Sequence, residues 1–229
     1  MSARSGAADE RSSAGLKARA RRLQEAEAIA ALRACDPVLR DVIDRAGPRA
    51  ADRGRGRPGD HYGALVRTIV GQQLSTRAAG AIYERLAARF GGRAPTPEEI
   101  LADDPDELRA AAGLSRAKVG FLRSLAEHVL DGSLQLHTLG RLPDERVIEE
   151  LVAVRGLGQW SAHMFLMFHL HRDDVLPVGD LGIRRAVQIA YGLPELPAPP
   201  LLCDIAEPWR PNRTLACLFL WDSLDNRPG

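Results

Sequence analysis

Hydrophobic residues recur along most of the chain at intervals of three and four positions, the spacing of one face of an α-helix. Two such stripes are Leu65, Val66, Ile69, Val70 and Val119, Leu122, Leu125, Val129. No convincing stretch alternates apolar and polar residues with the period of two that is typical of a half-buried strand. The pattern therefore predicts an all-α protein made of short helices.

Capping residues, prolines and glycines divide this pattern into separate helices. Thr96-Pro97-Glu98-Glu99 has the form of a capping box with proline at the first helical position. A first helix is expected to begin near Leu16, and 48–60 is expected to be a surface loop. The later predicted helices include 76–90, 143–154, 159–170, 180–191 and 211–224.

Composition narrows the class of protein. The 229 residues are 45% apolar and 27% charged, which is typical of a globular domain. Cys35, Cys203 and Cys217 are too few for a disulfide framework or a four-thiolate cluster, and this favours a reduced, cytoplasmic location. No apolar run approaches the roughly 18 residues of a membrane helix, and the N-terminus lacks the apolar stretch of a signal peptide.

The net charge of +1 hides an asymmetry. Residues 1–23 carry six cations and two anions, a net +4, which leaves 1 − 4 = −3 for the remainder. We expect residues 1–23 to form a basic, disordered tail and residues 24–229 to form the folded domain.

The segment 151–162, Leu-Val-Ala-Val-Arg-Gly-Leu-Gly-Gln-Trp-Ser-Ala, joins the end of one predicted helix to the start of the next. Gly156 and Gly158 allow a tight turn and leave backbone N–H groups uncovered at a helix N-terminus, where the helix dipole favours an anion. A phosphate diester is one candidate ligand. A packing corner between two helices is the alternative for an isolated Gly-x-Gly.

With four further motifs, this segment resembles the helix-hairpin-helix DNA glycosylase superfamily, most of all its 3-methyladenine DNA glycosylase II branch. The other motifs are residues 69–79, 112–118, 174–185, and 209–213 with Trp221, in family order between Asp36 and Trp221. The resemblance implies a two-lobed all-α fold with the active site in the cleft between the lobes. It also implies a helix-hairpin-helix at about residues 145–170 and a compact form without an N-terminal β domain.

The resemblance assigns the catalytic role to Asp180, which stands 22 residues after Gly158 and directly before a predicted helix. Cleavage of an N-glycosidic bond builds positive charge on the sugar, and a fixed carboxylate stabilises that charge and orients or deprotonates water. An aspartate in this place also serves as a helix cap, and both roles are compatible.

Trp160 bears on the type of glycosylase. Bifunctional members resemble this hairpin but carry a lysine two residues after the second glycine, whose amine forms a Schiff base. Trp160 stands there, so the resemblance implies base removal without strand cleavage. The branch with an iron–sulfur cluster is disfavoured because its four closely spaced cysteines are absent. His163, His169 and His171 lack the pattern of a zinc site, and we expect them at the surface or DNA rim.

The remaining site residues also come from the resemblance. The base pocket is expected to contain indole faces that stack on a cationic purine, although core positions are the alternative for the tryptophans. Its predicted residues are Trp160, Trp221, Met164 and Leu181. Gln73 is the better match to the DNA wedge and Gln72 the second, with a structural amide as the alternative for Gln72.

The hairpin completes the predicted set. Gly156, Leu157 and Gly158 are expected to bind a DNA phosphate, with no metal required. A monovalent Na⁺ or K⁺ ion at the carbonyls of Val152, Val154 and Leu157 is compatible with the family pattern. No other cofactor is expected.

The leading hypothesis is a monomeric, monofunctional DNA glycosylase that flips and excises alkylated bases of the 3-methyladenine and 7-methylguanine types from double-stranded DNA, the first step of base excision repair. It would be cytoplasmic and nucleoid-associated when bound to DNA. A glycosylase for another lesion class and a non-catalytic helix-hairpin-helix DNA-binding module are the alternatives. The near-neutral charge predicts modest non-specific DNA affinity, strengthened by the tail at low salt.

Overall fold

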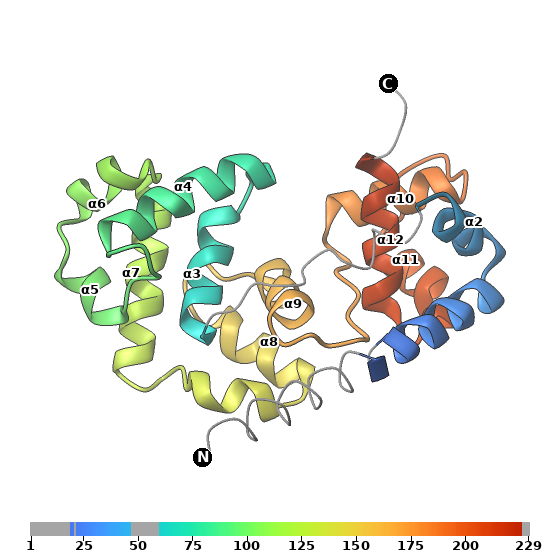
Figure 1. Ribbon diagram of the computed structural model, residues 1–229, viewed down its shortest axis with the longest axis horizontal. Helices are drawn as coiled ribbons and strands as arrows, with labels where there is room; N and C mark the ends of the chain where they lie inside the picture. The colour runs from blue at the N-terminus through green and yellow to red at the C-terminus, as the bar shows by residue number, and fades with distance from the viewer. Residues whose placement is uncertain (1–18, 21, 47–59, 226–229) are drawn as a thin grey trace, which may run out of the picture. The chain divides into compact units, whose positions relative to one another are not determined.

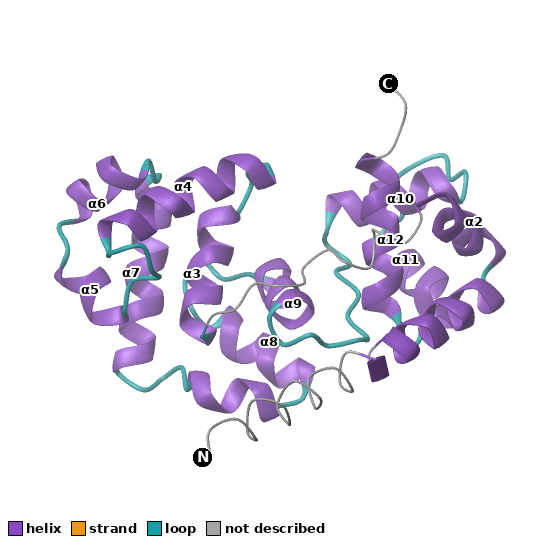
Figure 2. Ribbon diagram, in the orientation of Figure 1, coloured by secondary structure: helices purple, strands orange, loops and turns teal. Residues whose placement is uncertain are grey.

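The computed structural model describes residues 19–20, 22–46 and 60–225, and no strand occurs among them (Figure 2). The all-α prediction is confirmed for this part of the chain. The chain divides into two compact units, one of residues 54–180 and one of residues 1–53 and 181–229 (Figure 1). The predicted loop 48–60, apart from Asp60, lies outside the described residues, as do residues 1–18 and 21 of the predicted tail and the predicted helix start near Leu16. Residues 19, 20, 22 and 23, which fall within the range predicted to be disordered, are helical.

The unit of residues 54–180 is built around α3 (His61–Gly71), which packs against α4 (Thr76–Arg89), α7 (Arg116–Leu130) and α9 (Gln159–Phe168) (Figure 1). The apolar stripe of α3 is fully buried in these contacts. Its other elements are α5 (Pro97–Ala102), α6 (Pro105–Ala112), the 3-10 helix η2 (Leu136–Arg141) and α8 (Asp144–Val152). Helix α8 packs against α9, so these two helices form the predicted hairpin.

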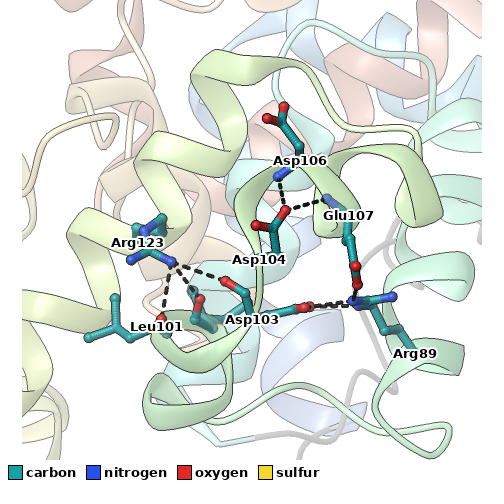
Figure 3. Close-up of polar contacts among 8 residues, drawn as sticks. Arg89, Leu101, Asp103, Asp104, Asp106, Glu107 and Arg123 are labelled. Atoms are coloured by element: carbon teal, nitrogen blue, oxygen red, sulfur yellow. Dashed lines mark hydrogen bonds and ion pairs between the residues drawn. The ribbon is translucent and has the colours of Figure 1, made fainter.

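Polar side chains fix the ends of α4 to α7 (Figure 3). Arg89 at the end of α4 forms a bidentate pair with Asp103, with both N–O distances 2.6 Å, and donates to Glu107 at 3.0 Å. Arg123 of α7 donates to the last carbonyls of α5, including that of Leu101 at 3.2 Å. Because these carbonyls have no partner within their own helix, Arg123 ties α7 to the end of α5. Helix α7 is thus held firmly against its neighbours.

The other unit contains helical residues 22–35, α2 (Pro37–Ala46), α10 (Leu181–Ala190), α11 (Pro199–Ala206), the 3-10 helix η3 (Glu207–Trp209) and α12 (Arg213–Asp225). Helices α2 and α10 both pack on α12. Asp36 joins distant parts of this unit: one carboxylate oxygen caps α2 through the N–H of Leu39 at 3.0 Å. The other accepts from the Tyr191 hydroxyl and from Trp209 Nε1 at 2.9 Å.

The predicted helices are present, with shorter ends and one omission. The capping box at Thr96 and Glu99 is formed as predicted. Helix α8 ends at Val152 rather than Val154, because the chain turns into the hairpin there. The omitted helix is α11, which begins at Pro199. No element is predicted from the sequence between Tyr191 and Trp209; the two prolines at 199 and 200 suit the first turn of a helix, where a missing N–H has no partner to lose. Within the described ranges, no helix combines the length and apolar character needed to cross a membrane.

Candidate active site

The hairpin between α8 and α9 is a tight turn closed by its own backbone. Val154 N–H donates to the Leu151 carbonyl at 3.1 Å, and Leu157 N–H donates to the Val154 carbonyl at 3.0 Å. Gly158 is the N-cap of α9 and supplies no side-chain cap. The first N–H groups of α9 therefore have no partner within the helix. These N–H groups and that of Gly158 are free to donate hydrogen bonds to an anion at the positive end of the helix dipole.

The two hairpin glycines are required for different reasons. Gly156 has φ +95°, and a Cβ added there would lie 2.1 Å from Cγ of Phe121 on α7. No side chain fits at that position. Gly158 has φ −100°, and an added Cβ would have no atom within 4 Å. The fold of this unit does not need glycine at 158, so the bare backbone there is available for close approach by an external group.

Asp180 and Trp160 meet directly. Trp160 Nε1 donates to Asp180 Oδ2 at 2.7 Å, so the indole and the carboxylate are joined by a charge-assisted hydrogen bond. Trp160 lies in the first turn of α9 and is 36% exposed. Asp180 directly precedes α10. The predicted catalytic carboxylate is thus held by the residue that stands two positions after the second hairpin glycine.

The other predicted pocket residues divide between the two units. Met164 lies one turn after Trp160 on α9 and is half-buried. Leu181 begins α10 and is 64% exposed, whereas Trp221 on α12 is half-buried. Trp160, Met164 and Asp180 belong to one unit, and Leu181 and Trp221 to the other. The base pocket and the inter-lobe cleft remain predictions.

The predicted wedge residues follow the last turn of α3 and differ in their environment. Gln72 Nε2 donates to the Gly156 carbonyl at 2.7 Å and to Ser161 Oγ at 3.0 Å, so its amide links α3 to the hairpin. Gln73 is exposed and has a left-handed backbone with φ +57°. Leu74, next to it, is 39% exposed. Gln73 is therefore the better-placed residue to reach a ligand.

The prediction that three histidines lie at the surface or DNA rim is wrong for His163. His163 is buried in α9 among apolar residues, and burial lowers its pKa. His169 is half-buried and hydrogen-bonds His61 of α3, with Nε2 2.6 Å from Nδ1. Burial lowers the pKa of His169, and the nearby imidazoles of His61 and His171 lower it further. The burial of His163 was not predicted because histidine is polar, although histidine side chains are often partly buried in apolar packing.

No group of three or more metal-binding side chains occurs among the described residues. Cys35 and Cys203 are exposed, and Cys217 is buried in α12.

Lys118, the last residue of the motif 112–118, has no role predicted from the sequence. Lys118 Nζ donates to the carbonyls of Val70 at 2.7 Å and Gln72 at 2.9 Å, so it holds the end of α3 beside the predicted wedge residues. The chain has 29 arginines and only two lysines, Lys17 and Lys118, and this rarity is the sequence signal that points to a special role for Lys118.

Comparison with known proteins places the chain in a family. The chain is 38% identical over 162 residues to DNA-3-methyladenine glycosylase 1 of Schizosaccharomyces pombe, covering 70% of this chain and 71% of that protein. The solved structure of a 3-methyladenine DNA glycosylase from the same yeast, in complex with abasic DNA, superposes with a TM-score of 0.75 at 33% identity, over 85% of this chain and 95% of that chain.

A DNA-3-methyladenine glycosidase from Bacillus halodurans superposes with a TM-score of 0.72 at 37% identity, over 87% of this chain and 89% of that one. The family model described as HhH-GPD superfamily base excision DNA repair protein matches residues 66–211, a range that includes the predicted wedge residues, the hairpin and Asp180. Because this match spans more than half of the 229 residues, the chain belongs to the HhH-GPD superfamily of base excision DNA repair proteins.

Proposed function

We propose that the protein is a monofunctional DNA-3-methyladenine glycosylase, which hydrolyses the N-glycosidic bond of alkylated bases in DNA as the first step of base excision repair. Family membership and the similarity to two enzymes of this activity support the class of reaction. The observation that carries the proposal is the Trp160–Asp180 hydrogen bond directly beside the hairpin. It fixes a carboxylate near the place where a DNA phosphate would bind.

The chemistry needs little more than this carboxylate. As the bond between C1′ and the base nitrogen breaks, its electron pair neutralises the cationic alkylated base, which leaves without a strong general acid. Positive charge on the sugar is stabilised by Asp180. Water then adds its oxygen to C1′, and its proton passes to the Asp180 carboxylate and on to solvent. The products are a free base and an abasic site.

Lyase activity is not expected, because no lysine among the described residues is placed to attack the sugar. The chain contains only Lys17 and Lys118, and Trp160 occupies the place where bifunctional enzymes carry their nucleophilic amine. Lys118 Nζ donates to two main-chain carbonyls, so this amine is committed to the end of α3. A Schiff base with C1′ is therefore not expected, and the DNA strand stays intact.

Base flipping would use the residues around the hairpin. We propose that Gln73 enters the stack as the wedge and donates or accepts a hydrogen bond at the orphaned base, as a polar side chain can. Trp160 and Trp221 would stack on the flipped purine, whose positive charge favours aromatic faces. The proposed substrate is double-stranded DNA that carries 3-methyladenine-type or 7-methylguanine-type lesions, bound by a monomer.

A monovalent cation at the hairpin would strengthen the phosphate site. The carbonyls that would hold it belong to Val152, Val154 and Leu157. The Val154 carbonyl already accepts the Leu157 N–H at 3.0 Å and keeps a second lone pair for an ion. The ion would supply positive charge beside the phosphate, and no step of the reaction needs it. Replacement of K⁺ by tetramethylammonium at constant ionic strength should then weaken DNA binding.

Base release from methylated DNA tests the proposed function. Wild-type protein should release 3-methyladenine and 7-methylguanine, identified by chromatography, whereas Asp180→Asn should release almost none. Asp173→Asn, which removes an exposed carboxylate from the preceding loop, is the matched control and should release as much as wild type. DNA binding without release of any damaged base would indicate a non-catalytic module. Release of only deaminated or oxidised bases would show that the enzyme acts on another class of lesion.

A further inference from the structure

The end of α3 is held by a lysine from another helix. Lys118, in the first turn of α7, donates from Nζ to the carbonyls of Val70 and Gln72 at 2.7 and 2.9 Å. Carbonyls at a helix C-terminus have no partner within the helix, and a positive charge there is favoured by the helix dipole. Lys118 is half-buried, and burial lowers the pKa of its side chain. Lys118 therefore acts as the C-terminal cap of α3.

The residue directly after these carbonyls has an unfavourable backbone. Gln73 has φ +57°, a left-handed conformation that is unfavourable for a non-glycine residue. Such a conformation persists only where the surroundings enforce it. Here the preceding residue, Gln72, is fixed twice: its carbonyl accepts from Lys118, and its side chain donates to Gly156 and Ser161. These contacts direct Gln73 out of the turn into solvent.

The same helix also supports the hairpin. Phe121 follows Lys118 by three positions, so both side chains lie on one face of α7. The Phe121 ring lies against Gly156, because a Cβ built there would be 2.1 Å from its Cγ. One face of α7 thus contacts the turn that carries Gln73 and the turn that carries the uncovered N–H groups. Helix α7 is itself tied to α5 through Arg123.

We propose that α7 is a frame that sets the spacing between the DNA wedge and the phosphate-binding hairpin, with Lys118 as the positioning residue for Gln73 and Phe121 as the positioning residue for Gly156. This inference rests on the proposed wedge role of Gln73. A wedge and a phosphate site on one duplex must keep a fixed distance, because groups that position the substrate lower the rate on the order of a hundredfold when they shift it by about 1 Å. Lys118 itself contacts neither DNA nor the reacting atoms, so its proposed role is positioning.

A double-mutant cycle tests the positioning role. Lys118→Met, Gln73→Ala and the double variant are compared in single-turnover excision, and base flipping is followed by the fluorescence of 2-aminopurine beside the lesion. Lys118→Met and Gln73→Ala should each reduce flipping and excision on the order of tenfold, and the double variant should lose no more than either single variant. Affinity for undamaged duplex should stay within about twofold of wild type, since the hairpin contacts with phosphate remain.

Three controls separate positioning from charge and folding. Arg116→Met removes an exposed cation two residues away on α7 and should leave flipping unchanged. Lys118→Arg keeps a donor for the same carbonyls and should restore most of the flipping signal. Urea unfolding of each variant shows that the folded protein is being compared, and the cycle is evaluated only from single-turnover measurements on the folded fraction.

The outcomes distinguish this inference from the proposed function. If Gln73→Ala flips and excises like wild type, the wedge role itself fails, and the positioning role fails with it. If Gln73→Ala is impaired but Lys118→Met is not, only the positioning role fails. Losses that multiply in the double variant, or an equal loss in Arg116→Met, would show that Lys118 acts by another route and would overturn the inference.

Discussion

Gly156 and Gly158 stand two positions apart and serve different purposes. Gly156 has a positive φ and no room for a side chain beside Phe121, so its role is in the fold. Gly158 has an ordinary φ and open space around it, so the fold does not need it. The bare backbone at Gly158 is instead suited to the close approach of a phosphate.

Alanine at Gly158 should therefore affect DNA binding, whereas alanine at Gly156 should affect stability. Gly158→Ala should unfold in urea like wild type but bind duplex DNA on the order of tenfold more weakly, since a methyl group would stand where the phosphate approaches. Gly156→Ala should lose several kcal/mol of stability through the clash with Phe121. Urea unfolding and DNA titrations measure both quantities. If Gly158→Ala and wild type bound DNA with equal affinity, the hairpin would not bind a DNA phosphate at Gly158.

The indole N–H of Trp160 can be tested apart from its aromatic ring. Trp160→Phe keeps an aromatic face for stacking and removes the donor to Asp180, so kcat should fall on the order of tenfold while KM changes little. Trp209→Phe makes the same chemical change at a buried indole that donates to Asp36. It should lower stability and leave kcat unchanged. A kcat for Trp160→Phe equal to that of wild type would show that the hydrogen bond does not position the carboxylate.

At the scale of elements, one carboxylate, that of Asp36, joins the start of α2, Tyr191 directly after α10, and η3. Burial raises the pKa of Asp36, but hydrogen bonds from Trp209, Tyr191 and the first N–H groups of α2 outweigh burial and place the pKa below its usual value. Because the unfolded pKa is about 3.9, the stabilisation is fully present above that value and is lost as the pH falls through the folded-state pKa.

The resulting prediction concerns the pH dependence of stability. Asp36→Asn should be about 2 kcal/mol less stable than wild type at neutral pH, because an amide cannot accept all of these hydrogen bonds. The difference in urea unfolding free energy should stay constant above about pH 5 and shrink below about pH 4. A difference that persists unchanged at low pH would show that the charge on Asp36 does not matter.

Local signals made most elements predictable. The capping box at Thr96, the proline after Asp104 and the left-handed Gly113 act within a few residues, so the sequence displays them directly. Helix α11, which has only eight residues and begins with two prolines, has no equally clear local signal, and no helix was predicted there. The contact between Asp36 and Trp209 spans 173 residues and depends on packing that no local pattern reveals.

The site shows the same division between local and distant information. Asp180 and the hairpin were named from motifs, yet the hydrogen bond between Asp180 and Trp160 joins residues 20 apart through the loop after α9. The contact of Lys118 with Val70 and Gln72 joins helices that adjoin only in the folded unit. Motifs therefore identify candidate residues, and the structure adds which of them touch.

For the whole molecule, the charge distribution predicts a role for the N-terminal residues. Residues 1–23 carry a net +4, and the remainder carries −3. Their deletion should make the slope of log K against log salt about 1–2 units less steep, because fewer counterions are released from DNA. Replacement of the tail cations by glutamine is the length-matched control and should make the slope less steep by a similar amount. An unchanged slope in both variants would show that the tail does not contact DNA.

Single-turnover excision of one alkylated base from a defined duplex tests the central claim most directly. Wild-type protein should release the base and leave a strand that breaks only after alkali, and borohydride should trap no protein–DNA adduct. Asp180→Asn should lower the excision rate at least on the order of a hundredfold while duplex binding remains. An excision rate for Asp180→Asn equal to that of wild type would contradict the account.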